Sequence, residues 1–301
     1  MKNTSKKIVF FGNERLSSGF EPHGAPTLTA LIKAGYTVIA VVANHQAATS
    51  RKARKLEVQE VAETYDIPVL LPKKLGDIHD ELIAKKPDIG VLVAYGRMVP
   101  RAIIDIFPYG IINIHPSLLP LYRGSTPIEQ AILDGAQQTG VSLMQLVQKM
   151  DAGPIFAQKT IALNGHETKQ ELTSTLLQNG GQMLLETLPH ILQGSIRPSE
   201  QNEALATYCG LISKQESVLN LSEPAVRLER EIRAYAAWPK SRLTIFGQEV
   251  IITKARIAQS PSEAGLVLAC GQKSYLTILE LIAPSGRRIS GEDFVRGYKK
   301  T

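Results

Sequence analysis

The chain has 301 residues, enough for two domains, and its 44% hydrophobic and 21% charged residues are ordinary proportions for a globular protein. Its two cysteines, Cys209 and Cys270, lie far apart and its six histidines lack the spacing of a metal site, so a disulfide framework and a bound metal have no support. The chain carries a net charge of +6, and it shows neither a secretory leader nor a run of about 18 apolar residues, which indicates a cytoplasmic protein.

Strand and helix patterns alternate along the first two thirds of the chain. We expect strands at Lys7–Phe11, Thr37–Val42, Pro68–Leu71, Ile89–Ala94, Ile111–Ile114, Val141–Val147 and Ile155–Ile161, and helices at Pro26–Lys33, Val58–Tyr65, Ile78–Lys85, Pro127–Leu133 and Lys169–Leu188. The central strands are almost continuously apolar, as in a parallel sheet covered on both faces. The pattern predicts an α/β fold with a Rossmann-like, doubly wound, mainly parallel sheet. We do not expect a dinucleotide-binding site after the first strand, because Phe11-Gly12-Asn13 lacks the G-x-G-x-x-G motif of such sites.

Two polar residues, Asn113 and His115, interrupt the apolar run of the strand that begins at Ile111. Residues two apart on a strand point to the same face, so the amide and the imidazole share one side of the sheet. Pro116 keeps His115 extended, because the residue before a proline avoids the helical region. Both side chains are expected at the carboxyl end of their strand, where open α/β sheets bind their ligands.

A carboxylate follows later in the chain, at Asp151 in the sequence Met-Asp-Ala-Gly. An amide donor, an imidazole and a carboxylate are suitable groups for acyl transfer to an amine. Taken singly, each residue also has a purely structural interpretation. His115 could be a strand-end residue whose hydrogen bonds are made within the fold, Asn113 could close a turn, and Asp151 could form an Asx-turn.

The last third of the chain differs in character. A polar crossing between Pro189 and Gln215 is followed by an expected helix and four short strands, which predict a small OB-like β-barrel. From Cys209 onward there are 14 Lys and Arg against 9 Asp and Glu, an excess that suits contact with phosphates but also an ordinary solvated surface. The expected elements are Glu223–Ala234, Arg242–Ile245, Glu249–Ala255, Leu266–Ala269 and Tyr275–Ile282, and the expected division is 1–188, a linker at 189–208, and 209–301.

Long ordered motifs carry a resemblance to a known family. They are P-D-I-G-V-L-V-A-Y-G-R-M-V-P, N-I-H-P-S-L-L-P-L-Y-R-G-S-T-P and M-D-A-G-P-I, between about Pro87 and Gln158, and I-S-G-E-D-F-V-R-G-Y near the end. With these motifs the chain resembles the folate-dependent formyltransferases, most closely those that act on tRNA, and the likeness extends over most of the chain.

The resemblance implies a function and a set of residues for it. It implies transfer of a formyl group from 10-formyltetrahydrofolate to the amino group of methionyl initiator tRNA, in the initiation of translation, by a cytoplasmic enzyme that needs no metal. We expect the enzyme to be a monomer. The family's catalytic residues fall on Asn113, His115 and Asp151. Its folate-binding segments fall on Val93, Tyr95, Gly96, Ser117, Leu118, Leu119 and Pro120.

Related tRNA enzymes also have a basic loop after the second strand, and here the positive residues of that region are Arg51, Lys52, Arg54 and Lys55. The alternative for this cluster is the exposed first turn of a helix. The sequence departs from the family here, because Asn44–Leu56 lacks the usual proline- and glycine-bearing loop. The Asn13–Ala25 loop is longer than usual, and Ala152 replaces a threonine that is more frequent in the family.

The chemistry of the expected reaction agrees with these residue types. A neutral amine attacks the formyl carbonyl and gives an intermediate with an oxyanion, which fixed donors such as Asn113 or His115 can stabilise. Asp151 can hold the imidazole in one tautomer. Two alternatives stay open at this point: a formyltransferase acting on an amino-sugar nucleotide or another small amine, and a folate- or RNA-binding module without catalysis.

Overall fold

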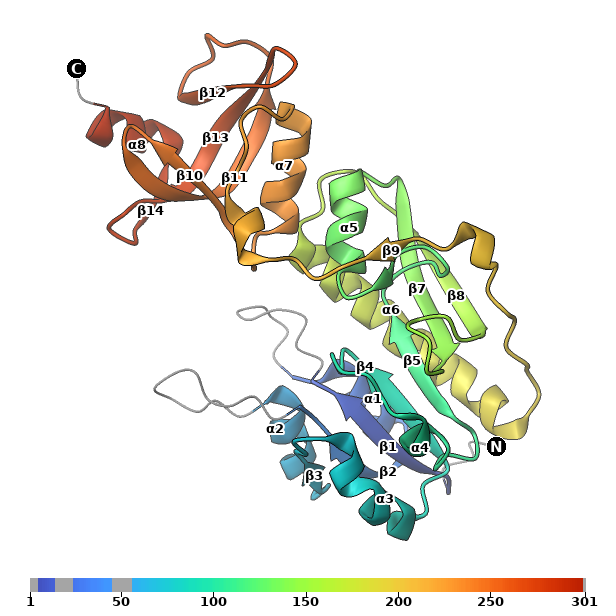
Figure 1. Ribbon diagram of the computed structural model, residues 1–301. Coiled ribbons are helices and arrows are strands. Elements are labelled where there is room, and N and C mark those ends of the chain that lie inside the picture. The colour runs from blue at the N-terminus through green and yellow to red at the C-terminus, as the bar shows by residue number, and fades with distance from the viewer. Residues whose placement is uncertain (1–4, 14–23, 45–55, 300–301) are drawn as a thin grey trace. The chain divides into compact units, whose positions relative to one another are not determined.

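The computed structural model describes residues 5–13, 24–44 and 56–299 (Figure 1). The chain forms two compact units. The first contains residues 1–127, 138–161 and 173–209, and the second contains residues 128–137, 162–172 and 210–301. No helix among the described residues combines the length and apolar character needed to cross a membrane.

The first unit is built on a seven-stranded sheet with the order β3-β2-β1-β4-β5-β7-β8. The pairs from β3 to β5 are parallel, whereas β7 runs antiparallel to β5. The expected α/β fold with a mainly parallel sheet is therefore confirmed. The strands are β1 (Lys7–Gly12), β2 (Thr37–Val42), β3 (Val69–Leu70), β4 (Ile89–Val93), β5 (Ile111–His115), β7 (Gln138–Gln145) and β8 (Ile155–Ala162).

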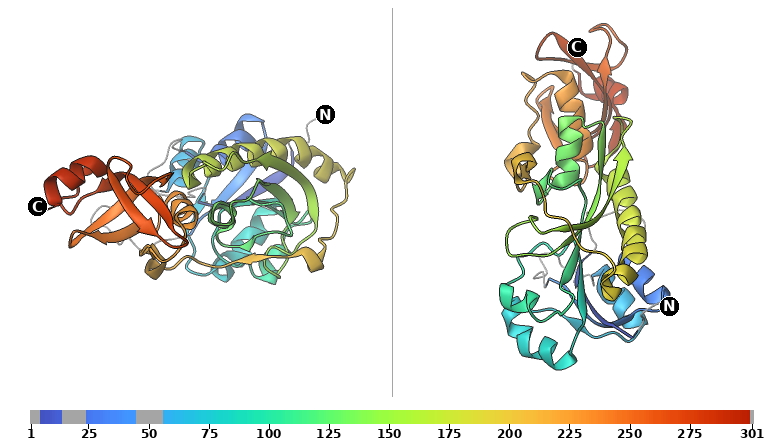
Figure 2. Two further views of the ribbon diagram at one scale, coloured as in Figure 1. Left: turned by 90° about the horizontal axis from the view of Figure 1, so that it is seen from above. Right: turned by 90° about the vertical axis from the view of Figure 1, so that its right-hand side faces the viewer.

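Helices cover both faces of this sheet, as the buried central strands require. On one face, Leu82 of a short helix and Ile103 of the next pack against β1, β2 and β4. On the other face a 25-residue helix lies against β5 (Figure 2). The helices of this unit are α1 (Pro26–Lys33), α2 (Glu57–Thr64), α3 (His79–Lys85), α4 (Arg101–Ile104) and most of α6 (Lys169–Gln193), with 3-10 turns η1 (Leu75–Ile78) and η2 (Glu203–Leu205).

A glycine allows α6 to approach β5 closely. A Cβ atom at Gly180 would lie 2.6 Å from Cγ2 of Ile114, a distance that real side chains do not reach. Ile114 stands between the two polar residues of β5. The helix backbone thus lies directly behind the strand that carries Asn113 and His115.

The second unit contains an antiparallel sheet with the order β10-β11-β13-β12, in which β14 also pairs with β13. Its core includes Leu228, Ile232 and Phe294, and the ring of Phe294 stacks on those of Phe246 and Tyr298. The elements of this unit are α5 (Pro127–Asp134), η3 (Lys214–Ser217), α7 (Ala225–Ala234), β10 (Ser241–Ile245), β11 (Gln248–Ala258), β12 (Leu266–Cys270), β13 (Ser274–Ile282), β14 (Arg288–Ser290) and α8 (Gly291–Tyr298).

The structure adds elements to those expected from the sequence and lengthens one of them. The helix α6 continues to Gln193, past Pro189, because a proline within a helix removes one backbone hydrogen bond without necessarily ending the helix. The polar crossing after α6 contains a short strand, β9 (Tyr208–Cys209), which pairs in parallel with β6 (Arg123–Gly124). Neither strand has the length or apolar pattern that reveals a strand in a sequence.

Candidate active site

Asn113 and His115 lie on β5, near the carboxyl end of the central strands, as the alternation of the strand predicts. Both are buried, with 6% and 4% of their surfaces exposed. Their register partners on β7 are Met144 and Ser142. Within the described part of the chain, the side-chain amide of Asn113 forms no hydrogen bond. Its amide hydrogens are therefore available to a bound molecule.

The imidazole of His115 is oriented by a backbone carbonyl. Its Nε2 lies 2.9 Å from the carbonyl oxygen of Tyr122. Because a carbonyl oxygen only accepts hydrogen bonds, Nε2 carries a hydrogen and donates it. The other ring nitrogen, Nδ1, faces Oδ2 of Asp151 at 3.8 Å. In the neutral ring, Nδ1 therefore carries the lone pair and lies beside a carboxylate oxygen.

Asp151 is held in place by its own loop and by β6. Its backbone has a φ of +46°, an uncommon conformation for a residue with a side chain. The backbone N–H of Gly124 donates a hydrogen bond of 2.8 Å to Oδ2, the same oxygen that faces His115. The structure thus brings together His115 and Asp151, which are far apart in the sequence.

The Ser117–Pro120 turn follows β5 directly and is tied to β7. Ser142 donates a hydrogen bond of 2.7 Å to the carbonyl oxygen of Ser117 and accepts one of 3.0 Å from the N–H of Leu119. The hydroxyl of Ser117 donates to the carbonyl oxygen of Leu121 at 2.6 Å. The Leu119–Pro120 peptide bond is cis. These hydrogen bonds fix the turn beside the end of β5.

The end of β4 forms a second turn at the same edge. Ala94 and Gly96 both have positive φ angles, of +49° and +73°. Tyr95 points into the core, where its ring meets that of Phe11 edge to face, and burial raises the pKa of its hydroxyl to about 12. This turn offers its backbone rather than the tyrosine ring to the edge. Asn44, which the sequence did not single out, donates from its amide to the carbonyl oxygen of Tyr95.

Several other residues missed by sequence reasoning surround Asp151. Arg123 is completely buried, and it pairs with Glu203 through Nη2 at 2.8 Å. Gln201 donates to the backbone of the Asp151 loop. The Arg-Gly pair after the Leu-Pro turn was a visible signal for Arg123, but nothing near Gln201 in the sequence marks it as a partner.

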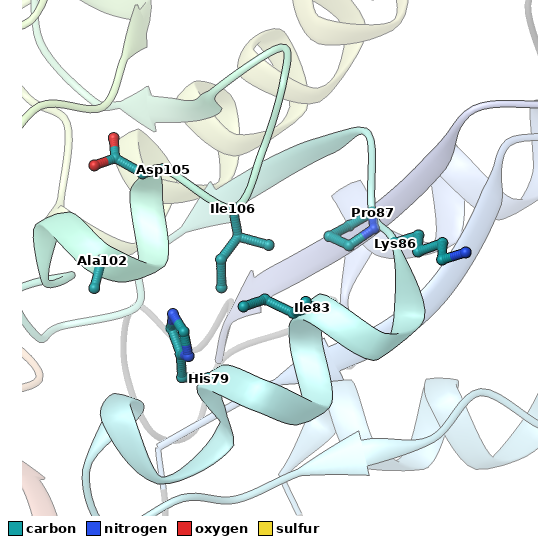
Figure 3. A pocket seen from close by; sticks show the side chains of 7 residues that line it. All are labelled: His79, Ile83, Lys86, Pro87, Ala102, Asp105 and Ile106. Atoms are coloured by element: carbon teal, nitrogen blue, oxygen red, sulfur yellow. The ribbon is translucent and has the colours of Figure 1, made fainter.

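A surface hollow between α3 and α4 takes no part in this arrangement (Figure 3). It is lined by His79, Ile83 and Asp105, among others, and His79 is paired with the exposed Asp80. None of its lining residues belongs to β5 or to the two turns described above.

Among the residues that the structure describes, no group of three His, Cys, Asp or Glu side chains could hold a metal ion. Arg51, Lys52, Arg54 and Lys55 lie outside the described residues.

The carboxyl end of β5 can therefore stabilise an oxyanion with the amide of Asn113. It can also accept a proton on the imidazole of His115, which faces the carboxylate of Asp151. Those are the requirements of attack by a neutral amine on a carbonyl carbon. A covalent enzyme intermediate is not needed, and no cysteine or serine at the edge is paired with His115 in the described residues.

Comparison with known proteins gives matches over nearly the whole chain. Residues 6–188 match the formyl transferase family and residues 211–299 match the formyl transferase C-terminal domain. A methionyl-tRNA formyltransferase of Roseiflexus castenholzii is 37% identical over 313 residues, covering 99% of this chain and 97% of the relative. One of Bacillus subtilis is 34% identical, covering 97% and 94%.

Solved structures agree in fold at lower identity. An N-formyltransferase of Helicobacter canadensis, in complex with folinic acid and dTDP-3-aminofucose, has a TM-score of 0.68 at 18% identity and covers 90% of this chain and 98% of its own. HypX of Aquifex aeolicus, in complex with tetrahydrofolic acid, has a TM-score of 0.66 at 16% identity, with 97% of this chain and 47% of its own covered.

Proposed function

The chain belongs to the formyl transferase family, and from this premise we propose that it is a methionyl-tRNA formyltransferase. It transfers the formyl group of 10-formyltetrahydrofolate, its cosubstrate, to the amino group of methionyl initiator tRNA and so serves the initiation of translation. The observation that carries the assignment is full-length similarity at 34 to 37% identity to enzymes of that name. The buried edge of β5 agrees with it, because its groups suit acyl transfer to an amine.

We propose that Asn113, His115 and Asp151 carry out the transfer. The amino nitrogen of the methionyl group attacks the formyl carbon, and the amide of Asn113 donates a hydrogen bond to the oxyanion that forms. Nδ1 of His115 takes the proton that the attacking nitrogen must lose, directly or through a water. Asp151 stabilises the imidazolium across 3.8 Å. The oxyanion then returns to a carbonyl as the bond between the formyl carbon and N10 breaks, and the imidazolium of His115 gives its proton to N10, directly or through a water.

We propose that the two fixed turns receive the folate. The end of β4, with Val93, Tyr95 and Gly96, presents backbone groups to the pterin ring. The apolar turn Ser117–Pro120, which includes Leu118 and Leu119, contacts the remainder of the carrier. Support comes from the position of both turns at the carboxyl end of the sheet, where ligands of α/β folds bind.

We further propose that tRNA binding involves the last third of the chain and the basic residues Arg51, Lys52, Arg54 and Lys55. The antiparallel sheet of the second unit is compatible with the OB-like barrel expected over 209–301, with 189–208 as a linker and 1–188 as the catalytic domain. We propose that the enzyme works in the cytoplasm as a monomer.

The basic loop has a direct test. Each phosphate contact that a protein loses reduces the salt dependence of binding, so Arg51→Ala combined with Arg54→Ala should weaken tRNA binding and flatten the plot of log affinity against log salt by up to about 2. The affinities are measured by filter binding from low to moderate salt. An unchanged slope would remove this loop from the interface.

The alternative substrate is an amino-sugar nucleotide, because the structure of the Helicobacter canadensis enzyme contains dTDP-3-aminofucose on the same fold. That likeness concerns the fold alone, at 18% identity. It makes the alternative worth including in the assay.

The experiment is a formyl-transfer assay with the purified protein and 10-formyltetrahydrofolate. The acceptors are methionyl initiator tRNA, methionyl elongator tRNA and a dTDP-amino sugar, each tested alone. Formylation of the initiator tRNA, with little of the elongator and none of the sugar, is the expected result. Transfer to the sugar alone would overturn the assignment and keep the formyltransferase chemistry.

A further inference from the structure

The polar stretch from Ser199 to Cys209, here named the connecting segment, is part of the first unit and lies beside the catalytic residues. At its start, the backbone N–H of Ser199 donates to the carbonyl oxygen of Ile155 and the N–H of Ile155 donates to that of Ser199, each at 2.8 Å. Its end is the strand β9. Between these two anchors, side chains of the segment reach the loop that carries Asp151.

Gln201 makes the contact to that loop. Its side-chain N–H2 donates to the backbone carbonyl oxygens of Asp151, at 2.8 Å, and of Gly153, at 2.7 Å. The two hydrogens of the amide are thus donated to two carbonyl oxygens of the same turn. Because the backbone of Asp151 has an uncommon positive φ, the turn benefits from external hydrogen bonds that hold this conformation.

Arg123 fixes Gln201 in turn. The oxygen Oε1 of Gln201 accepts from Nε of Arg123 at 3.1 Å and from Nη2 at 2.8 Å. The remaining donors of the guanidinium go to Glu203 and to the hydroxyl of Tyr208. Every side-chain atom of Gln201 that can form a hydrogen bond is therefore occupied, and its orientation is determined.

The same part of the chain holds the two backbone groups that contact the catalytic side chains. The N–H of Tyr122, whose carbonyl accepts from His115, donates to Oγ1 of Thr207 at 2.8 Å. Gly124, whose N–H donates to Asp151, pairs with Cys209 in the β6–β9 ladder. A Cβ atom at Gly124 would lie 2.0 Å from the carbonyl oxygen of Cys209, so the two backbones are in direct contact.

We propose that Gln201 and Arg123 are positioning residues for the formyl transfer, and that the connecting segment is a structural part of the active site. They fix the loop from Asp151 to Gly153 so that its carboxylate faces Nδ1 of His115. The proposal rests on the proposed function, because it assumes that Asp151 assists the transfer.

The test compares three variants at two neighbouring positions. Gln201→Ala removes both donors to the loop. Gln201→Glu keeps an acceptor for Arg123 but turns a carboxylate oxygen toward two carbonyl oxygens. Glu200→Ala is the matched control, because Glu200 is exposed and adjacent in the same segment. Misplacing a catalytic group by about 1 Å costs on the order of 100-fold in rate, so we expect kcat to fall about 10- to 100-fold in both Gln201 variants. The KM for 10-formyltetrahydrofolate should stay within about twofold.

A double-mutant cycle separates positioning from general destabilisation. If Gln201 acts through Asp151, then Gln201→Ala should lower kcat little or not at all in an Asp151→Ala background. A purely structural role would instead give the same fold-loss in both backgrounds, and that result would overturn the proposal. Normal kcat for both Gln201 variants in an otherwise active enzyme would overturn it as well.

Hydrogen exchange supplies a readout that does not depend on the acceptor. In the full chain without substrates, Gln201→Ala should increase amide exchange in the peptide that covers Lys149–Gly153, and Glu200→Ala should not. If the wild-type protein fails to formylate methionyl tRNA, the proposed function fails. The exchange measurement then still decides whether the segment holds the loop, and unchanged exchange overturns the positioning role.

Discussion

The strand β5 and the connecting segment contribute to the same site in opposite ways. β5 is five residues long, completely buried and apolar except for Asn113 and His115. The connecting segment is polar and largely exposed, and its only regular elements are a 3-10 turn and a two-residue strand. The first presents the two side chains that we propose to react, and the second holds the carboxylate that faces one of them.

The difference shows that a side chain on a central strand and a side chain on a loop are held in place by different means. The side chains on β5 are oriented by the pleat of a central strand, with neighbours on both sides, so they need few contacts of their own. Asp151 lies on a loop, which has no ladder to orient it, and so depends on hydrogen bonds from Gly124 and Gln201. Substitutions in the two regions should therefore have different consequences.

The largest effect is expected on β5. Asn113→Ala removes the proposed donor to the oxyanion and His115→Ala removes the proposed proton acceptor, so each should lower kcat about 100- to 1000-fold. The melting temperature should change far less than the activity, because the printed hydrogen bond that these two buried side chains form is the one from His115 to the carbonyl oxygen of Tyr122. Activity and thermal unfolding are measured on the same preparations. His79→Ala, in the hollow of Figure 3, is the control and should keep normal activity. Near-normal turnover in both variants would contradict the mechanism.

At Arg123, which contacts the connecting segment, the main effect is expected on stability rather than on activity. Arg123→Met leaves Gln201 and Glu203 without their buried partner and should lower the free energy of unfolding by about 2 kcal/mol. Arg101→Met is the matched control. Its side chain is 71% exposed in a surface pair with Asp105, and its loss should lower the free energy of unfolding much less, because exposed ion pairs contribute little. Urea denaturation measures both, and equal effects would show that burial of Arg123 adds nothing.

A smaller effect is expected from pH. Hydrogen bonds from Arg123 and then from Lys149 lower the pKa of Glu203 from 4.5 to about 2. A lowered pKa in the folded state means that Glu203 stabilises the protein fully above about pH 4.5 and loses this contribution as the pH falls toward 2. Glu203→Gln should therefore lose stability relative to wild type at pH 7, and the two urea midpoints should approach each other as the pH decreases. A constant difference would show that this ionisation plays no part.

The reacting residues and their supports also differ in how far a sequence reveals them. Asn113 and His115 could be placed on one face because a strand alternates with a period of two. Their partner Asp151 came from family resemblance, since no local pattern links it to β5. The contact between Arg123 and Gln201 spans 78 positions, and β6 and β9 are only two residues long, so neither periodicity nor composition could show them.

The pairing of β6 with β9 joins residues that are 85 positions apart, and this has a consequence for the order in which the site is made. During synthesis from the N-terminus, Asn113, His115 and Asp151 all exist well before Cys209 does. The backbone that supports them is complete only once that cysteine has emerged and β9 has docked. A nascent chain, or a recombinant fragment, that stops at the end of α6 thus contains the three side chains that we propose to react while lacking the strand that completes their support.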